Sequence, residues 1–116
     1  MKKCATFTAT IWVGVKEHCT PNPPDDWQDR ARKLLQEYVD EVGLCVTFTP
    51  TEYLYTNGAE PGFCVGLINY PRFPSSSQKI RKHALEIARR ALAEFQQFKV
   101  SVVLPQETVM IEEESE

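Results

Sequence analysis

The chain has 116 residues, of which 42% are hydrophobic and 25% are charged, as expected for one folded domain rather than a disordered or fibrous protein. Its 16 acidic and 13 basic residues give a net charge of −3, so it lacks the basic field that nucleic-acid-binding domains use, and we expect no nucleic-acid partner. No segment approaches the roughly 20 apolar residues that a membrane span needs, and threonines interrupt the apolar N-terminus, so we expect a cytoplasmic protein without membrane contact.

The first half of the sequence predicts a strand followed by a helix. Residues 5–15 alternate between apolar residues and mainly threonine, which is the period of a strand with one buried face. The segment TPNPPDD then interrupts the pattern. Residues 27–42 place apolar side chains at spacings of three and four, which predicts a helix that Gly43 ends.

The second half predicts two strands, a helix and a last strand. Residues 44–56 form a strand that Pro50 marks as an edge strand or a bend, and Asn57-Gly58 is a strong hairpin-turn signal. A strand over 62–70 and a helix from about 76 to 95 follow. The last strand covers 99–104, and a further apolar run at 107–111 resumes it after a proline.

This element order predicts an α+β, ferredoxin-like βαββαβ two-layer sandwich. Two amphipathic helices would cover one face of a four-stranded antiparallel sheet with strand order 4-1-3-2. We expect a single domain over residues 1–111 and a disordered acidic tail over 112–116. The four cysteines lie far apart without a CxxC pair, so we expect free, buried thiols and no metal site.

The strand over 5–15 has a second face, which points away from the helices. This face carries small hydroxyl side chains and one indole, a less polar surface than an exposed sheet usually presents. We predict that it forms a homo-oligomer interface, and a solvated sheet face is the alternative. The predicted interface residues are Thr6, Thr8, Thr10 and Trp12.

The start of the second helix breaks the rule that acids gather at a helix N-terminus. Its first two turns carry Lys79, Arg81 and Lys82, and the first acid is Glu86. We predict a site for a small anion here. The predicted ligand-binding residues are Asn69, Tyr70, Arg72, Ser75, Ser76, Ser77, Lys79 and Lys82. Two alternatives stay open: these residues form a plain solvated surface, or the acidic residues 112–114 neutralise the cations.

Three groups of residues are candidates for catalysis, and none is assigned to it. His18-Cys19 are neighbours whose side chains point apart in most conformations, and His83 borders the apolar stripe of its helix. The aromatic and acidic residues of the predicted hairpin could line a pocket. They are Tyr53, Tyr55 and Glu60. With no catalytic motif of high specificity, we expect a protein that is not an enzyme and that carries no cofactor.

Residues 40–77, DEVGLCVTFTPTEYLYTNGAEPGFCVGLINYPRFPSSS, resemble small uncharacterised α+β proteins of bacteria and their phages. The resemblance carries over no activity and no functional residue. It implies a small phage protein that interferes with a host system, for instance by sequestering a signalling molecule.

Together these observations predict a homo-oligomeric binding protein for a small anionic, nucleotide-like ligand. The first alternative is a protein–protein interaction module that uses the open sheet face. The second is a small hydrolase that acts at the same end of the fold as the anion site.

Overall fold

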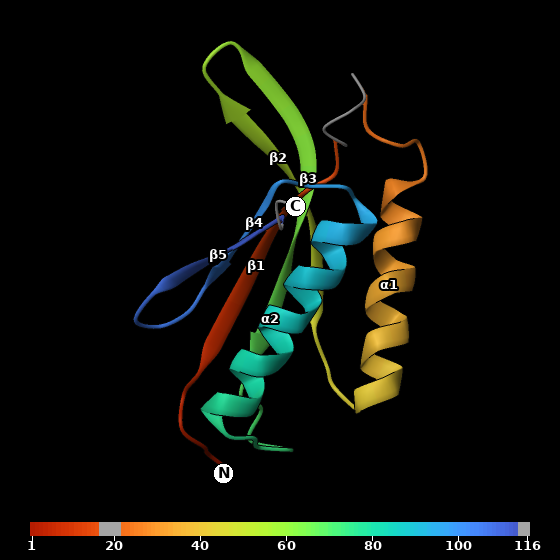
Figure 1. The fold of residues 1–116 in the computed structure, drawn as a ribbon. Coiled ribbons are helices and arrows are strands. Elements are labelled where there is room, and N and C mark those ends of the chain that lie inside the picture. Colours follow the sequence, from red (N-terminus) through yellow and green to blue (C-terminus); the bar gives the residue numbers. More distant parts are fainter. Residues whose placement is uncertain (17–21, 114–116) are drawn as a thin grey trace.

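The computed structural model describes residues 1–16 and 22–113. Figure 1 shows two helices side by side over one face of an antiparallel sheet. The sheet has five strands in the order β2-β3-β1-β4-β5. The elements are β1 (Thr8–Gly14), α1 (Trp27–Val42), β2 (Thr47–Tyr55), β3 (Gly58–Ile68), α2 (Ser77–Glu94), β4 (Lys99–Val103) and β5 (Thr108–Glu112). Within the described ranges, neither helix is long and apolar enough to cross a membrane.

The α+β class with two helices is confirmed, and the prediction of four strands is wrong. The predicted order 4-1-3-2 recurs within the sheet, but β5 adds a fifth strand beside β4. The break at Pro105 is the turn of a hairpin, which the N–H of Leu104 closes on the carbonyl of Glu107 at 2.8 Å. Glu112, assigned to the tail from the sequence, ends β5, and residues 114–116 lie outside the described part of the chain.

The core lies between the sheet and the helices. On β1 the odd residues are buried and the even ones face away, as the alternation predicted. Phe63 of β3 is fully buried among three aromatic rings, with centroids 6.2 Å away at Trp27, 5.4 Å at Phe48 and 5.6 Å at Phe95. This aromatic cluster joins both helices to the centre of the sheet.

The position of β2 at the sheet edge explains how a proline fits within it. Pro50 lies opposite Phe63, and an edge strand can present its missing N–H to solvent. The hairpin turn consists of Thr56 and Asn57, because Tyr55 pairs with Gly58. Asn57 has a φ of 63°, which asparagine tolerates better than most residues.

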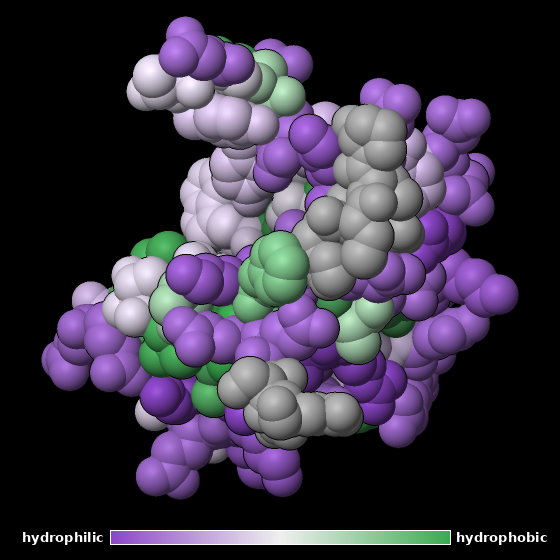
Figure 2. Space-filling model, turned by 45° about the horizontal axis from the view of Figure 1, so that its top comes forward, coloured by the Kyte–Doolittle hydropathy of each residue, from purple (hydrophilic) through white to green (hydrophobic). Residues whose placement is uncertain are grey.

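The β2–β3 hairpin extends well beyond the rest of the sheet. Strand β1 ends at Gly14, opposite Gly62 of β3, whereas β2 and β3 remain paired out to the turn. The end of the hairpin therefore stands clear of the body, as Figures 1 and 2 show, and the molecule measures 49 × 31 × 28 Å. This geometry leaves an inner corner where β1 stops and the hairpin continues.

Candidate functional site

The predicted anion site does not form one cluster, because two of its members hold the backbone. Asn69 donates from Nδ2 to the carbonyl of Ala5 at 2.8 Å and accepts from the N–H of Ser75 at 2.9 Å. Ser76 is the N-cap of α2, and its Oγ accepts from the N–H of Lys79 at 3.2 Å. Asn69 and Ser76 thus shape the loop before α2 rather than face a ligand.

Three other predicted residues point elsewhere. The hydroxyl of Tyr70 accepts a 3.6 Å hydrogen bond from the thiol of Cys45, and Arg72 is exposed. Ser77 lies in a separate hollow with Arg81, whose guanidinium is paired with Glu107 at 2.6 Å. The predicted residues that share one cavity are Ser75, Lys79 and Lys82.

The two described acids of the tail, Glu112 and Glu113, do not neutralise the cations of α2, which was one of the two alternatives. Strand β5 runs antiparallel to β4, so the chain returns to the level of Lys99, which lies opposite Glu112. The start of α2 lies near the other end of β4, where Arg81 meets Glu107 in the β4–β5 turn. Glu112 and Glu113 therefore lie at the opposite end of the sheet from the cations of α2. The remainder of the tail lies outside the described residues.

The cavity that holds these three residues is the helix-pair cleft, a space of about 760 Å³ between the end of α1 and the first half of α2. On its wall the hydroxyl of Tyr38 and Nδ1 of His83 are 2.7 Å apart. Burial, with help from Lys82 and Lys79, lowers the pKa of His83, and burial raises the pKa of Tyr38. The pair is therefore neutral at pH 7. The described residues that line the cleft are Tyr38, Glu41, Val42, Gly43, Leu44, Phe73, Pro74, Ser75, Lys79, Lys82, His83, Glu86, Arg89 and Arg90.

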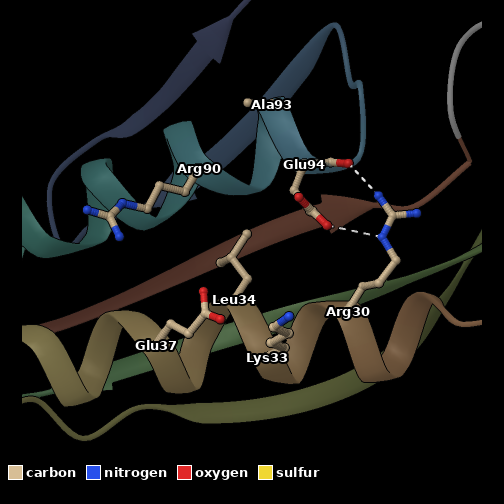
Figure 3. Close-up of a pocket in the computed structure, with 7 residues that line it drawn as sticks. All are labelled: Arg30, Lys33, Leu34, Glu37, Arg90, Ala93 and Glu94. Carbon is tan, nitrogen blue, oxygen red and sulfur yellow. Dashed lines mark hydrogen bonds and ion pairs between the residues drawn. The ribbon is translucent and has the colours of Figure 1, made fainter.

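A second groove of about 580 Å³ runs along the same two helices, and Figure 3 shows its Arg30 bonded to Glu94. Arg30 donates to the carboxylate of Glu94 at 3.1 Å and to its backbone carbonyl at 2.7 Å, and it also lies over the ring of Phe95. Lys33 and Glu37 extend from α1 along the same groove. A groove whose main cation is already held in this way is a poor anion site.

The inner corner at the base of the projecting hairpin gathers a different set of groups. We call it the hairpin-base cluster, and its members are Trp12, Gly14, Tyr53, Glu60, Gly62 and Gln97. Tyr53 and Glu60 are paired across β2 and β3, two residues beyond Gly62, where β1 ends. The rings of Trp12 and Tyr53 meet edge to face, with centroids 6.4 Å apart. The cluster thus combines two aromatic rings with a carboxylate on the open face of the sheet.

The glycines leave the space that these side chains occupy. A β-carbon at Gly14 would lie 2.9 Å from Oε1 of Gln97 and 3.2 Å from Oε1 of Glu60. One at Gly62 would collide with the ring of Tyr53. Gln97 donates its amide to the carbonyls of Lys16 and Phe95 at 2.9 Å, so its oxygen is left as an acceptor beside Glu60. The ring of Tyr53 lies directly over the backbone of Gly62, and the oxygens of Glu60 and Gln97 lie over Gly14. We call these two glycines the glycine floor.

The ionisation of this cluster favours hydrogen bonding over nucleophilic chemistry. Burial raises the pKa of Tyr53 to about 12, with contributions from Cys64 and Glu60, so the phenol stays protonated near neutral pH. Burial also raises the pKa of Cys64, which keeps it a thiol and a weak nucleophile. A nearby cation would meet two rings and two acceptor oxygens, an arrangement that suits positive charge.

The remaining predicted residues are placed as follows. Thr8, Thr10 and Trp12 lie on the open face of the sheet, whereas Thr6 precedes β1 and lines the hollow near Arg81. His18 and Cys19 lie outside the described residues. Cys4, Cys45 and Cys64 are free thiols, but the prediction that they are buried is wrong, because Cys45 is exposed and the other two are half-buried. In residues 1–16 and 22–113, no group of three or more His, Cys, Asp or Glu side chains is placed to hold a metal ion.

Sequence reasoning found parts of the hairpin-base cluster but did not join them. It named Tyr53 and Glu60 as pocket residues and Trp12 as an interface residue, and it missed Gln97. The available signal was Gly62, one of three glycines that lie on the open face of β3 together with Gly58 and Gly66.

Comparisons with known proteins identify the fold. No protein-family model matches the sequence, and no curated protein matches it significantly. Among solved structures, the chain is similar to a phage SAM lyase in complex with S-methyl-5'-thioadenosine, with a TM-score of 0.77 and 16% identity over 97% of this chain and 94% of the other. It is also similar to a phage SAM lyase in the apo state, with a TM-score of 0.71 and 17% identity over 100% of this chain and 98% of the other.

These matches confirm the resemblance to phage proteins and correct two predictions. The expectations of a protein that is not an enzyme and of a binding protein that sequesters its ligand are wrong, because the matched structures are those of a lyase. No catalytic motif stands within any one segment of the sequence. The groups of the hairpin-base cluster come from four separate parts of the chain.

Proposed function

We propose that this chain is a lyase that cleaves S-adenosylmethionine and releases S-methyl-5'-thioadenosine, with the hairpin-base cluster as its site. The observation that carries the proposal is the meeting of Glu60 with the rings of Trp12 and Tyr53 on a glycine floor. The fold shared with the phage lyase over nearly the whole chain supports it.

The substrate's charges match the cluster better than they match the helix-pair cleft. S-Adenosylmethionine carries a positive sulfonium and a positive ammonium group. Aromatic faces attract such cations, and a carboxylate accepts hydrogen bonds from an ammonium. The helix-pair cleft, which presents Lys79 and Lys82, would repel both groups. The charges of the hairpin-base cluster therefore suit binding of a cationic nucleoside, and those of the predicted anion site do not.

The reaction removes the sulfonium charge. The bond from sulfur to the methionine side-chain carbon breaks, and both electrons go to sulfur, which leaves as a neutral thioether. A lyase adds no water, so the new bond at this carbon forms within the substrate. Its own carboxylate oxygen attacks the carbon as the thioether leaves, and the amino-acid part is released as a lactone that keeps the ammonium charge. Because charge on sulfur falls in the transition state, a site that surrounds the sulfonium with rings instead of water favours the transition state over the bound substrate.

Within this scheme each residue has one task. Trp12, 40% exposed, offers an indole face to the sulfonium or the adenine, and Tyr53 borders it with a protonated phenol. Glu60 and the amide oxygen of Gln97 accept hydrogen bonds from the N–H groups of the substrate and so hold it in place.

The test is incubation of the purified protein with S-adenosylmethionine, followed by chromatography with mass detection. We expect S-methyl-5'-thioadenosine to accumulate with time and with enzyme concentration, above the slow breakdown of the substrate in buffer. A heat-denatured sample is the control. Release at the rate of that control, across pH 6–9 and at saturating substrate, would contradict the proposed function.

We also propose that the chain forms a homo-oligomer through the open sheet face. Four large apolar side chains on this face are at least 40% exposed: Trp12, Ile68, Val103 and Met110. Ile68, Val103 and Met110 pair with Thr8, Thr10 and Ser101, so apolar and hydroxyl side chains alternate across this face. A second copy would remove the apolar side chains from water.

Multi-angle light scattering tests this association. We expect a multiple of the chain mass for the wild type and a smaller species for Val103→Lys, because a lysine at the centre of the interface would be buried without a partner. Leu54→Lys is the matched control, since Leu54 is 75% exposed on the other face of the hairpin. A monomeric wild-type protein at high concentration, or a Val103→Lys protein of unchanged mass, would rule the interface out.

A further inference from the structure

The helix-pair cleft has more positive charge than its own carboxylates neutralise. Glu86 accepts from Arg90 at 3.1 Å and lies 3.9 Å from Arg89, while Glu41 is 3.3 Å from Arg90. Both acids of the cleft are therefore committed to the two arginines. Within the described part of the chain, Lys79 and Lys82 form no ion pair, so two positive charges remain at the mouth of the cavity.

Two other arginines of the fold have carboxylate partners within the chain. Arg30 is paired with Glu94, and Arg81 is paired with Glu107. The acidic residues at the end of β5 lie at the far end of the sheet from the cleft. Within residues 1–16 and 22–113 no carboxylate lies within ion-pair distance of the two lysines, so they are open to an anion from solution.

The cleft offers more hydrogen-bond donors than a carboxylate can use. Each lysine ammonium has three N–H groups, and Ser75 adds a hydroxyl on the same wall. The neutral His83 ring shares a hydrogen bond between its Nδ1 and the hydroxyl of Tyr38, and in the tautomer whose Nδ1 accepts, the Nε2–H adds another donor. A phosphate, with two negative charges and three free oxygens, matches this set.

We propose that the helix-pair cleft is a second binding site, which takes the phosphate dianion of a phosphate monoester or of inorganic phosphate. Lys79 and Lys82 bind the anion, Ser75 and His83 complete its contacts, and the exposed ring of Phe73 borders the same cavity. The cleft shares no residue with the hairpin-base cluster and lies at the other end of α2, so the site stands independently of the proposed lyase activity.

His83 provides a spectroscopic readout that a nonspecific surface effect would not give. The groups that face it are Tyr38 and Glu41 on α1 and Lys79, Lys82, Glu86 and Arg90 on α2. A bound dianion offsets the two lysine charges that lower the pKa of His83. Proton NMR of the imidazole should therefore show an upward shift of this pKa when phosphate binds, and His83→Gln identifies its resonance, because the chain has two histidines.

The experiment uses thermal unfolding and this NMR titration with three probes: inorganic phosphate, adenosine 5'-monophosphate and adenosine. We expect the two phosphates to raise the melting temperature and to shift the His83 resonance, and adenosine to do neither. Tighter binding of the monophosphate identifies an organic phosphate as the ligand, and equal binding identifies free phosphate. Adenosine acting alone, or no response to millimolar phosphate, would overturn the proposal.

Variants assign the binding to the cleft. Each lysine replaced by alanine removes a charge-assisted contact, so Lys79→Ala/Lys82→Ala should weaken phosphate binding about a hundredfold, roughly tenfold for each residue. Lys33→Ala is the matched control, because Lys33 lies on the neighbouring groove of the same helix pair. A double variant that binds phosphate as the wild type does, or a control that loses binding equally, would refute the assignment to the cleft.

Discussion

Replacing Glu60 by glutamine is expected to lower kcat/KM for cleavage of S-adenosylmethionine by about thirtyfold. The carboxylate lies beside the acceptor oxygen of Gln97 and next to the ring of Tyr53, where it can accept charge-assisted hydrogen bonds from the substrate ammonium. Glutamine keeps the shape and one acceptor but loses the charge, a change worth about 2 kcal/mol for such a bond. Steady-state kinetics with detection of the thioether product measures it.

The hairpin itself supplies the matched control for this variant. Glu52 lies on β2 one residue before Tyr53 and pairs with Pro61, so its side chain points to the other face of the same two strands. Glu52→Gln removes the same charge at a similar distance from the turn. We expect it to keep the wild-type kcat/KM, with both variants unfolding within about 2 °C of the wild type because Glu52 is exposed and Glu60 is only half-buried.

Two outcomes would show that Glu60 does not contact the substrate in the active site. A Glu60→Gln protein with wild-type kcat/KM would show that the carboxylate does not contact the substrate. Equal losses in both glutamate variants would point to a general effect of net charge on a cationic substrate rather than to a contact. High salt separates these cases further, because it weakens long-range attraction but not a direct hydrogen bond.

The sequence predicted those parts of the fold in which one face of an element is buried. The alternation in β1 and the three-and-four spacing in α1 and α2 follow directly from this one-sided burial. Strand β5 was missed as a separate strand because its five residues follow Pro105 so closely that they looked like a continuation of β4. The antiparallel return depends on the turn at residues 105–106, which periodicity does not report.

The candidate site was less predictable because it depends on strand register and on one backbone reversal. Tyr53 and Glu60 are seven residues apart, and only the position of the turn decides that they face each other. Gln97 reaches the same corner because Gln96 takes a φ of 49° after α2, so that the N–H of Gln97 bonds to the carbonyl of Leu92 at 2.9 Å. No local pattern in the sequence specifies that left-handed residue, since glycine is absent there.

The cations that the sequence places at the start of α2 differ in their surroundings. The unusual cations at the start of α2 do border a cavity, and Lys79 and Lys82 face it together. Arg81 points to the opposite side of the helix and meets Glu107, a residue 26 positions away. Pairing over such a distance follows from the β4–β5 turn, whereas the sequence pattern predicted one strand over this segment.

Replacing Phe63 by alanine is expected to lower the free energy of unfolding by about 3–5 kcal/mol. This residue is fully buried, and the rings of Trp27, Phe48 and Phe95 surround it. Truncation would leave a cavity between elements that cannot close together, since α1, β2 and the end of α2 each contribute one ring. A loss of this size is a large part of the 5–15 kcal/mol typical of a domain. Urea unfolding followed by circular dichroism measures it.

Two further variants separate cavity formation from a general intolerance of change at phenylalanine positions. Phe63→Leu keeps most of the volume and should cost less than about 1.5 kcal/mol, whereas Phe98→Ala, at a side chain that is 56% exposed, should cost less than about 1 kcal/mol. Equal losses in Phe63→Ala and Phe98→Ala would contradict a core centred on Phe63. Because Phe63 and Gly62 are adjacent on β3 and face opposite sides of the sheet, the same core contact fixes the floor on which Tyr53 rests. A Phe63→Leu protein should therefore keep the hairpin-base cluster in place and retain cleavage.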